Sequence, residues 1–335
     1  MGGNLAKSPL VALFYAALLH FAAVFLPFSE SYGSLLHSYE PQIPPTRYLL
    51  MVACCLWIVV VVAIALAATE HTGFKGVLLL LPACLGLVWI VPLAQQLAFG
   101  EVSGVMTQKD TLLRLIQGCT STLLTLLLCA LLMAKKSAAP GTPPSKKYKL
   151  KYLRLAIFLL VLPLIYSLLQ FILGYFLAWR DDAFRVYYQA GGNQGIMHMI
   201  IGMLLEAPRY AVFALLRGIL SALFSLPLLL LLPGKRMVYI LCHTMLCLSG
   251  ALLYLMPDPV MPTPVAMTHL IASAVILAVF GGISGYLLHL CVEAPKAAPL
   301  PAKAPTTAVK GAPAKADPPT TASKIAALNS TRRAR

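Results

Sequence analysis

The chain has 335 residues, of which 59% are apolar and only 11% are charged. Soluble domains carry roughly a quarter charged residues, so this composition excludes a soluble globular protein. The formal net charge of +15 invites a nucleic-acid-binding interpretation. However, residues 135–154 and 294–335 hold seven and eight of the basic residues against one acidic residue, Asp317. Basic residues confined to one loop and one tail are typical of the cytoplasmic segments of a membrane protein. No nucleic-acid partner is therefore predicted.

Eight apolar stretches approach or exceed the length of about 20 residues with which an α-helix crosses a bilayer. The stretches are continuous rather than alternating, so each predicts a helix that satisfies its own backbone hydrogen bonds in lipid. The predicted helices are 9–28, 48–68, 76–97, 111–134, 152–179, 209–233, 237–256 and 265–291. The predicted fold class is therefore an all-α polytopic membrane protein with about eight transmembrane helices. Pro82 and Pro92 are expected to kink the third helix.

Breaks in the apolar pattern divide the chain into four parts. Residues 1–134 hold helices one to four, and residues 135–151 form a basic, flexible cytoplasmic linker. Residues 152–293 hold helices five to eight, and a short apolar segment at 196–208 is expected to lie in the membrane interface or to be re-entrant. The Ala/Pro/Lys-rich tail, 294–335, is expected to be disordered because it has almost no large apolar side chain to bury.

The loop charges predict an orientation, because Lys and Arg accumulate on the cytoplasmic side of membrane proteins. Four segments are basic: the N-terminus, the linker, the Lys235-Arg236 turn and the tail. The loops at 29–47, 98–110 and 257–264 are neutral or acidic. Eight helices with both termini in the cytoplasm place all four basic segments on the cytoplasmic side.

Polar residues at similar depth in several predicted helices form a candidate binding site. Arg217 lies eight residues after Arg209, about 12 Å along the helix at 1.5 Å per residue. A mid-helix arginine costs about 2.5–3.5 kcal/mol on insertion scales, so Arg217 should face the bundle or a wet cavity. The other candidate residues in or beside this outer half are His20, Gln117, Gln170, Glu206 and His269.

Two interpretations of these polar residues are open. In the functional one they line an outward-opening pocket in which Arg217 contacts an anion, such as a lipid phosphate or a carboxylate. In the structural one they hydrogen-bond to one another and lock the helices together. His243, in the inner half, is expected to be packed or interfacial rather than catalytic.

Motifs for catalysis or metal binding are not found in the sequence. Glu206-Ala-Pro-Arg209 resembles the glutamate motif of membrane-embedded CAAX-type proteases only in part, because that motif has paired glutamates and an arginine four positions on. HExxH, GxSxG and serine/lysine or paired-aspartate arrangements are missing. Cys242, His243 and Cys247 lack the spacing and the second ligand pair of a zinc site. No catalytic residue, metal or cofactor is therefore predicted.

Several runs within residues 174–290 carry a resemblance to a known family. They are Gly-Tyr-Phe-Leu-Ala-Trp from Gly174, Phe-Arg-Val-Tyr-Tyr from Phe184, Leu-Leu-Arg-Gly from Leu215 and Pro-Asp-Pro-Val-Met-Pro from Pro257. These runs resemble an uncharacterised family of bacterial multi-spanning integral membrane proteins. In that family the last run leads into a helix with Arg, His, Glu and Asn at set spacings. His269 matches in register, whereas Ala266, Ala272 and Leu277 stand at the other three positions.

The predicted function follows from these features and has three forms. The first is a non-catalytic integral protein of a bacterial inner (cytoplasmic) membrane that acts as an assembly, accessory or partner-binding factor. The alternative is a transporter or lipid-handling permease with an outward-facing polar pocket around Arg217, and the third is a membrane-embedded lipid-modifying enzyme. The expected partners are the lipid bilayer, a membrane protein and, through residues 135–154 and 294–335, anionic lipid head groups.

Overall fold

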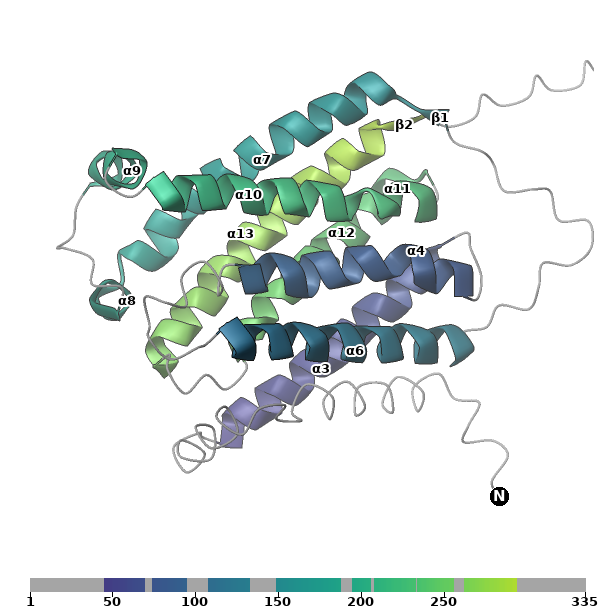
Figure 1. The fold of residues 1–335 in the computed structure, drawn as a ribbon, viewed down its shortest axis with the longest axis horizontal. Coiled ribbons are helices and arrows are strands. Elements are labelled where there is room, and N and C mark those ends of the chain that lie inside the picture. The colour runs from purple at the N-terminus through teal and green to yellow at the C-terminus, as the bar shows by residue number, and fades with distance from the viewer. Residues whose placement is uncertain are drawn as a thin grey trace, which may run out of the picture. The chain divides into compact units, whose positions relative to one another are not determined.

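The computed structural model is helical almost throughout the residues that it describes (Figure 1). These residues are 45–69, 74–94, 108–132, 149–187, 195–205, 208–232, 234–255 and 262–293. The predicted first helix, the tail after Glu293 and most of the predicted linker lie outside them.

Within the described residues, four helical segments are long and apolar enough to cross a membrane. They are Phe74–Ala94, Tyr152–Trp179, Pro208–Leu231 and Thr263–Leu290. Three shorter apolar helices accompany them, at Val52–Ala68, Leu115–Leu131 and Arg236–Ala251. All seven segments lie within two residues of stretches predicted as transmembrane helices. In this part of the chain the prediction of apolar helices is confirmed, with four of them able to cross a membrane.

The first described helices are α3 (Pro45–Ala68), α4 (Phe74–Cys84) and α6 (Gln108–Leu132). Pro82 lies inside α4, and a π-helical segment, η3 (Leu85–Ile90), follows it. At the end of η3 the Val91 N–H donates to the carbonyl oxygen of Gly86, five residues earlier. Proline lacks an N–H and disturbs the α-helical pattern, so the expected irregularity after Pro82 takes the form of a π-segment.

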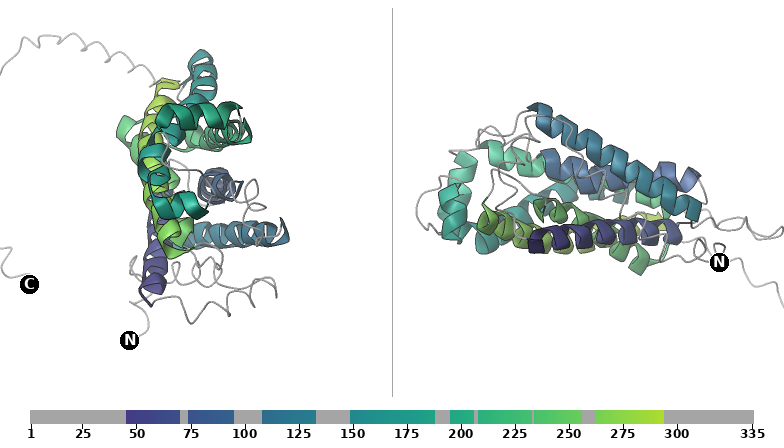
Figure 2. Two further views of the ribbon diagram at one scale, coloured as in Figure 1. Left: turned by 90° about the vertical axis from the view of Figure 1, so that its left-hand side faces the viewer. Right: turned by 90° about the horizontal axis from the view of Figure 1, so that it is seen from below.

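The second group of helices begins with α7 (Tyr152–Gly174), which continues as the π-helical segment η4 (Tyr175–Trp179). Two short helices follow, α8 (Asp182–Tyr187) and α9 (Ile196–Leu205). α9 matches the predicted short apolar segment, whereas α8 lies in a stretch predicted to be a loop. In Figure 1, α9 is seen nearly end-on, and in the right-hand view of Figure 2 it runs across the direction of the long helices.

The last helices are α10 (Pro208–Ser225), α11 (Pro227–Leu231), α12 (Arg236–Ala251) and α13 (Thr263–Leu290). A short 3-10 helix, η5 (Leu252–Leu255), extends α12. Pro208 begins α10, where its missing N–H leaves no helical hydrogen bond unmade. Pro227 separates α11 from α10, so the predicted single helix 209–233 consists of two pieces.

Glycines allow a close helix contact that joins α12 to α13. A Cβ atom added to Gly281 would lie 2.6 Å from the Cα of Thr244, and one added to Gly285 would lie 2.7 Å from the carbonyl oxygen of Tyr239. Backbones approach this closely only where side chains are missing. α13 also packs against α7, and α7 against α10, so these helices form a continuous group.

One end of this group is closed by two short antiparallel strands, β1 (Lys149–Leu150) and β2 (Val292–Glu293). Lys151 Nζ lies 3.6 Å from Glu293 Oε2, and Arg154 donates to the carbonyl oxygen of Leu290 at 3.2 Å. The last residues of the predicted flexible linker are therefore paired with the segment that leads into the tail. They are not a free loop, and the fold is not purely α-helical.

Replacing Gly281 with Ala should destabilise the protein by about 1–3 kcal/mol, because the new methyl group overlaps backbone atoms of α12. Thermal unfolding of the purified protein measures this effect. Gly282→Ala is the matched control, since a Cβ there would meet only the Thr244 hydroxyl at 3.9 Å. Equal stability of the two variants would contradict the close contact between α12 and α13.

Candidate functional site

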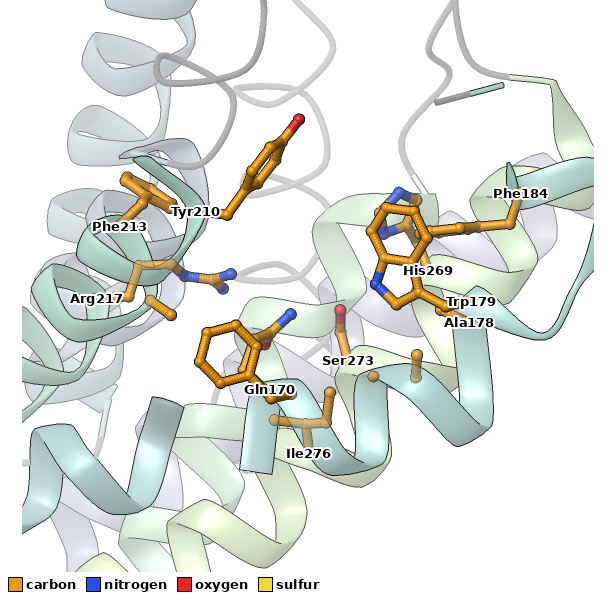
Figure 3. Close-up of a pocket in the computed structure, with 14 residues that line it drawn as sticks. Gln170, Ala178, Trp179, Phe184, Tyr210, Phe213, Arg217, His269, Ser273 and Ile276 are labelled. Carbon is orange, nitrogen blue, oxygen red and sulfur yellow. The ribbon is translucent and has the colours of Figure 1, made fainter. Parts of the chain in front are cut away.

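Helices α7, α10 and α13 line a pocket of about 100 Å³ near the end of the bundle that carries α8 (Figure 3). Much of the lining is apolar or aromatic, with contributions from η4 and α8. The polar side chains of the lining are Gln170, Tyr210, Arg217, His269 and Ser273. Such a site has the composition of a ligand pocket, in which a few polar groups sit in an apolar wall.

Arg217 projects from α10 into this pocket (Figure 3) and is 5% exposed. Its Cζ atom lies 5.3 Å from the ring centroid of the buried Tyr166 on α7, within the range of a cation–π interaction. The neighbouring Gly218 allows this arrangement, since a Cβ there would lie 2.5 Å from the Cα of Pro163. The close approach of α10 to α7 thus places the guanidinium between an aromatic face and the pocket.

His269, on α13, belongs to an aromatic cluster on the other side of the pocket (Figure 3). Its ring is stacked on Tyr254, with centroids 4.9 Å apart and planes at 6°, and lies 4.7 Å from the ring of Phe184. Trp179 in turn meets Phe184 edge-on at 5.2 Å. The packing of these rings fixes the orientation of the imidazole.

The short helix α8 is held in place by Asp181. Asp181 Oδ1 accepts a hydrogen bond from the Phe184 N–H at 3.0 Å, which caps α8, and Oδ2 accepts one from Thr268 on α13 at 3.2 Å. Arg185 donates to the carbonyl oxygens of Trp179 and Arg180 and forms an ion pair with Asp182. These contacts bring Phe184 to the pocket.

Three of the predicted site residues therefore converge: Arg217, His269 and Gln170. Gln117 is buried on α6 and does not line this pocket, because α6 packs against α3, α4 and η3 instead. A depth similar to that of Arg217 therefore did not place Gln117 in the wall of the pocket. His20 and Glu206 lie outside the described residues.

Several lining residues were not predicted, although some of them share a helical face with a predicted one. Tyr210 and Phe213 precede Arg217 by seven and four residues, and Ser273 follows His269 by four. These spacings place Tyr210 and Phe213 on the same side of α10 as Arg217, and Ser273 on the same side of α13 as His269. Helical periodicity could therefore have identified them. The sequence carries no comparable signal for Phe184, because its position depends on the docking of α8.

A second buried polar cluster surrounds His243, which is fully buried on α12. Its Nε2 atom lies 2.5 Å from Ser225 Oγ on α10, and its Nδ1 atom lies 2.8 Å from Ser284 Oγ on α13. Ser225 Oγ also reaches the carbonyl oxygen of Ser221, Ser284 Oγ reaches that of Gly281 at 3.2 Å, and Cys247 Sγ lies 3.4 Å from Nδ1. Both ring nitrogens therefore have hydrogen-bond partners, and either neutral tautomer fits them.

This pattern satisfies a neutral imidazole from both sides and joins three helices. His243 is fully buried and packed.

The comparisons with known proteins do not identify the chain. It matches no protein-family model, no curated protein and no solved structure. The resemblance over residues 174–290 therefore stays a prediction. All eight cysteines are free thiols, and the part of the chain that the structure describes holds no group of three or more His, Cys, Asp or Glu side chains placed to share a metal ion.

Ser225→Ala and Ser284→Ala should each lower the free energy of unfolding by about 1–3 kcal/mol, because each removes a hydrogen-bond partner of the buried His243. Denaturant titration in detergent measures this loss. Ser167→Ala is the control, since this hydroxyl bonds only the carbonyl oxygen of Pro163 in its own helix, at 3.0 Å. A loss as large in Ser167→Ala would show that the His243 network does not join the helices.

Proposed function

We propose that this chain is a non-catalytic, multi-pass protein of a bacterial cytoplasmic membrane that binds an anionic ligand in the pocket around Arg217. Eight spans with both termini in the cytoplasm are part of the proposal, and the pocket then opens away from the cytoplasm. This is the function of a transporter or permease, or of a receptor for such a ligand.

The position of Arg217 is the observation that carries the proposal. Its side chain is buried, yet it reaches the wall of a cavity (Figure 3). Among the described lining residues, Arg217 is the one Lys or Arg, and none is Asp or Glu. A positive charge in apolar surroundings is weakly screened, so it attracts an anion more strongly than it would in water.

The arrangement of basic residues supports the orientation. Lys149, Lys151 and Arg154 gather beside β1 and β2, and Arg236 lies over the ring of Tyr286 near the same end of α13, at 4.6 Å. In Figure 1, β1 and β2 lie at the opposite end of α7 from α8 and α9. If the basic end is cytoplasmic, as is usual for Lys and Arg, the pocket end is external.

The pocket favours ligand binding over the accessory role that ranked first on sequence grounds. An accessory factor needs a docking face for its client. The exposed apolar side chains of the described helices, such as Leu164 and Val212, are what lipid-facing surfaces of any helical membrane protein carry. They give the accessory role no support of its own, and no described carboxylate lines the pocket to support a lipid-modifying enzyme.

Arg217→Leu should weaken the binding of anions to the purified protein by about tenfold or more, because it removes the one described cation of the pocket. Isothermal titration calorimetry in neutral nanodiscs, with acetate, 3-phenylpropionate, inorganic phosphate and phosphatidic acid as probes, measures this. Arg236→Leu, a change at the start of α12 beside Tyr286 and away from the pocket, is the control and should bind as the wild type does. Wild-type protein that binds none of the probes, or binds them equally after Arg217→Leu, would refute the proposal.

The orientation has its own test. Alkaline phosphatase inserted within residues 188–194, between α8 and α9, should be active, because this enzyme folds only outside the cytoplasm. A green fluorescent protein inserted before Lys235 should fluoresce, because that turn is proposed to be cytoplasmic. The reverse pattern would place the pocket on the cytoplasmic side.

A further inference from the structure

The lining residues of the pocket are arranged in two layers along the helices. On α10, Tyr210 lies nearest the end that carries α8, and Arg217 follows seven residues later, about 10 Å deeper. On α13, Ser273 lies four residues, about 6 Å, beyond His269. On α7 and η4 the order is the same, since Trp179 ends the segment and Gln170 precedes it by nine residues.

Three kinds of hydrogen-bond donor meet in the deep layer. The guanidinium of Arg217, the carboxamide of Gln170 and the hydroxyl of Ser273 point toward the same space (Figure 3). A guanidinium matches a carboxylate with two parallel N–H donors, and the amide and hydroxyl groups can donate further hydrogen bonds to the same anion. The deep layer is therefore suited to one small oxyanion.

The outer layer is aromatic. Trp179 and Phe184 meet edge-on at 5.2 Å, and the His269 ring lies 4.7 Å from that of Phe184. Tyr210 lines the pocket from the opposite helix, α10. Aromatic walls bind flat or aliphatic groups by contact area, so an apolar body fits between the deep layer and the mouth.

The size and the layering together oppose a phospholipid as the ligand. The pocket volume of about 100 Å³ holds only a small part of a phospholipid, and any ligand longer than the pocket must extend through its mouth. A phospholipid also places its anionic head at the membrane surface and its chains in the interior. Here the cation is deep and the apolar layer is outside, which is the opposite order.

We infer that the ligand is a small organic monocarboxylate with an apolar body, bound with its carboxylate at Arg217, Gln170 and Ser273 and its apolar end toward the aromatic mouth. This inference rests on the proposed function and names the class of its ligand. The molecule enters from the end that carries α8, with the carboxylate first.

Calorimetry on the wild-type protein in phosphatidylcholine nanodiscs tests the ligand class without any variant. 3-Phenylpropionate should bind about tenfold or more tightly than its neutral amide, 3-phenylpropanamide, because only the acid carries the charge that Arg217 recognises. It should also bind more tightly than acetate, which lacks the apolar body. Octanoate should bind at least as well as butyrate, because the growing chain extends through the open mouth.

A matched pair of glutamines tests the deep layer. Gln170→Leu should weaken 3-phenylpropionate binding about tenfold, whereas Gln117→Leu, at a buried glutamine outside the pocket, should leave the affinity unchanged. Ser273→Ala should weaken binding in the same direction. Equal affinities of the two glutamine variants would overturn the assignment of the deep layer.

The remaining outcomes separate this inference from the proposed function. Arg217-dependent binding of phosphatidic acid or inorganic phosphate, with no binding of 3-phenylpropionate, would overturn the monocarboxylate and leave anion binding intact. An amide that binds as well as the acid would also overturn it. Binding of none of these anions to the wild-type protein would overturn both.

Discussion

The approach of α10 to α7 at Gly218 and Pro163 is the contact on which the pocket depends. Because Gly218 has no side chain, the backbones of the two helices meet there. The preceding residue, Arg217, is then held against the ring of Tyr166 on one side and faces the cavity on the other. A buried guanidinium is costly unless its surroundings compensate, and this contact provides an aromatic face at the required depth.

α13 connects this pocket to the rest of the bundle. Its cytoplasm-proximal half, in the proposed orientation, carries Gly281, Ser284 and Gly285, which pack closely against α12 and complete the His243 network. Its other half carries His269 and Ser273, which line the cavity. Both halves contain buried polar groups. The difference is that His243 is enclosed by serines of neighbouring helices, whereas Arg217, His269 and Ser273 line a pocket.

The sequence predicted the helices well because their physical cause is local. Continuous apolar runs can satisfy their backbone only as helices, and the described helices fall within a few residues of the expected ends. Two prolines interrupt the predicted helices. Pro82 is followed by a π-segment, and Pro227 divides the predicted sixth helix. The helix α8 was missed, since its six residues have no apolar periodicity and depend on the cap and on the tertiary contact that Asp181 provides.

For the candidate site, the sequence predicted only how far along its helix each polar residue lies. Counting residues along the helices placed Arg217, Gln170 and His269 in the same half of the bundle, and all three line the pocket. Gln117 has a similar depth but belongs to α6, which packs elsewhere. Depth follows from the rise of a helix, whereas the neighbour that a side chain meets depends on the rotation of that helix about its axis.

The amino-acid sequence by itself determined that the chain is helical, where its apolar runs lie and how deep each polar residue is placed, because these properties depend on composition and on distance along one helix. Tertiary structure alone decided that α7, α10 and α13 leave a cavity at Arg217 and that β1 pairs with β2, whose paired residues are 142 and 144 positions apart. The physical reason is that glycine contacts, ring stacking and helix rotation involve residues far apart in the chain, and no local pattern encodes which of them will meet.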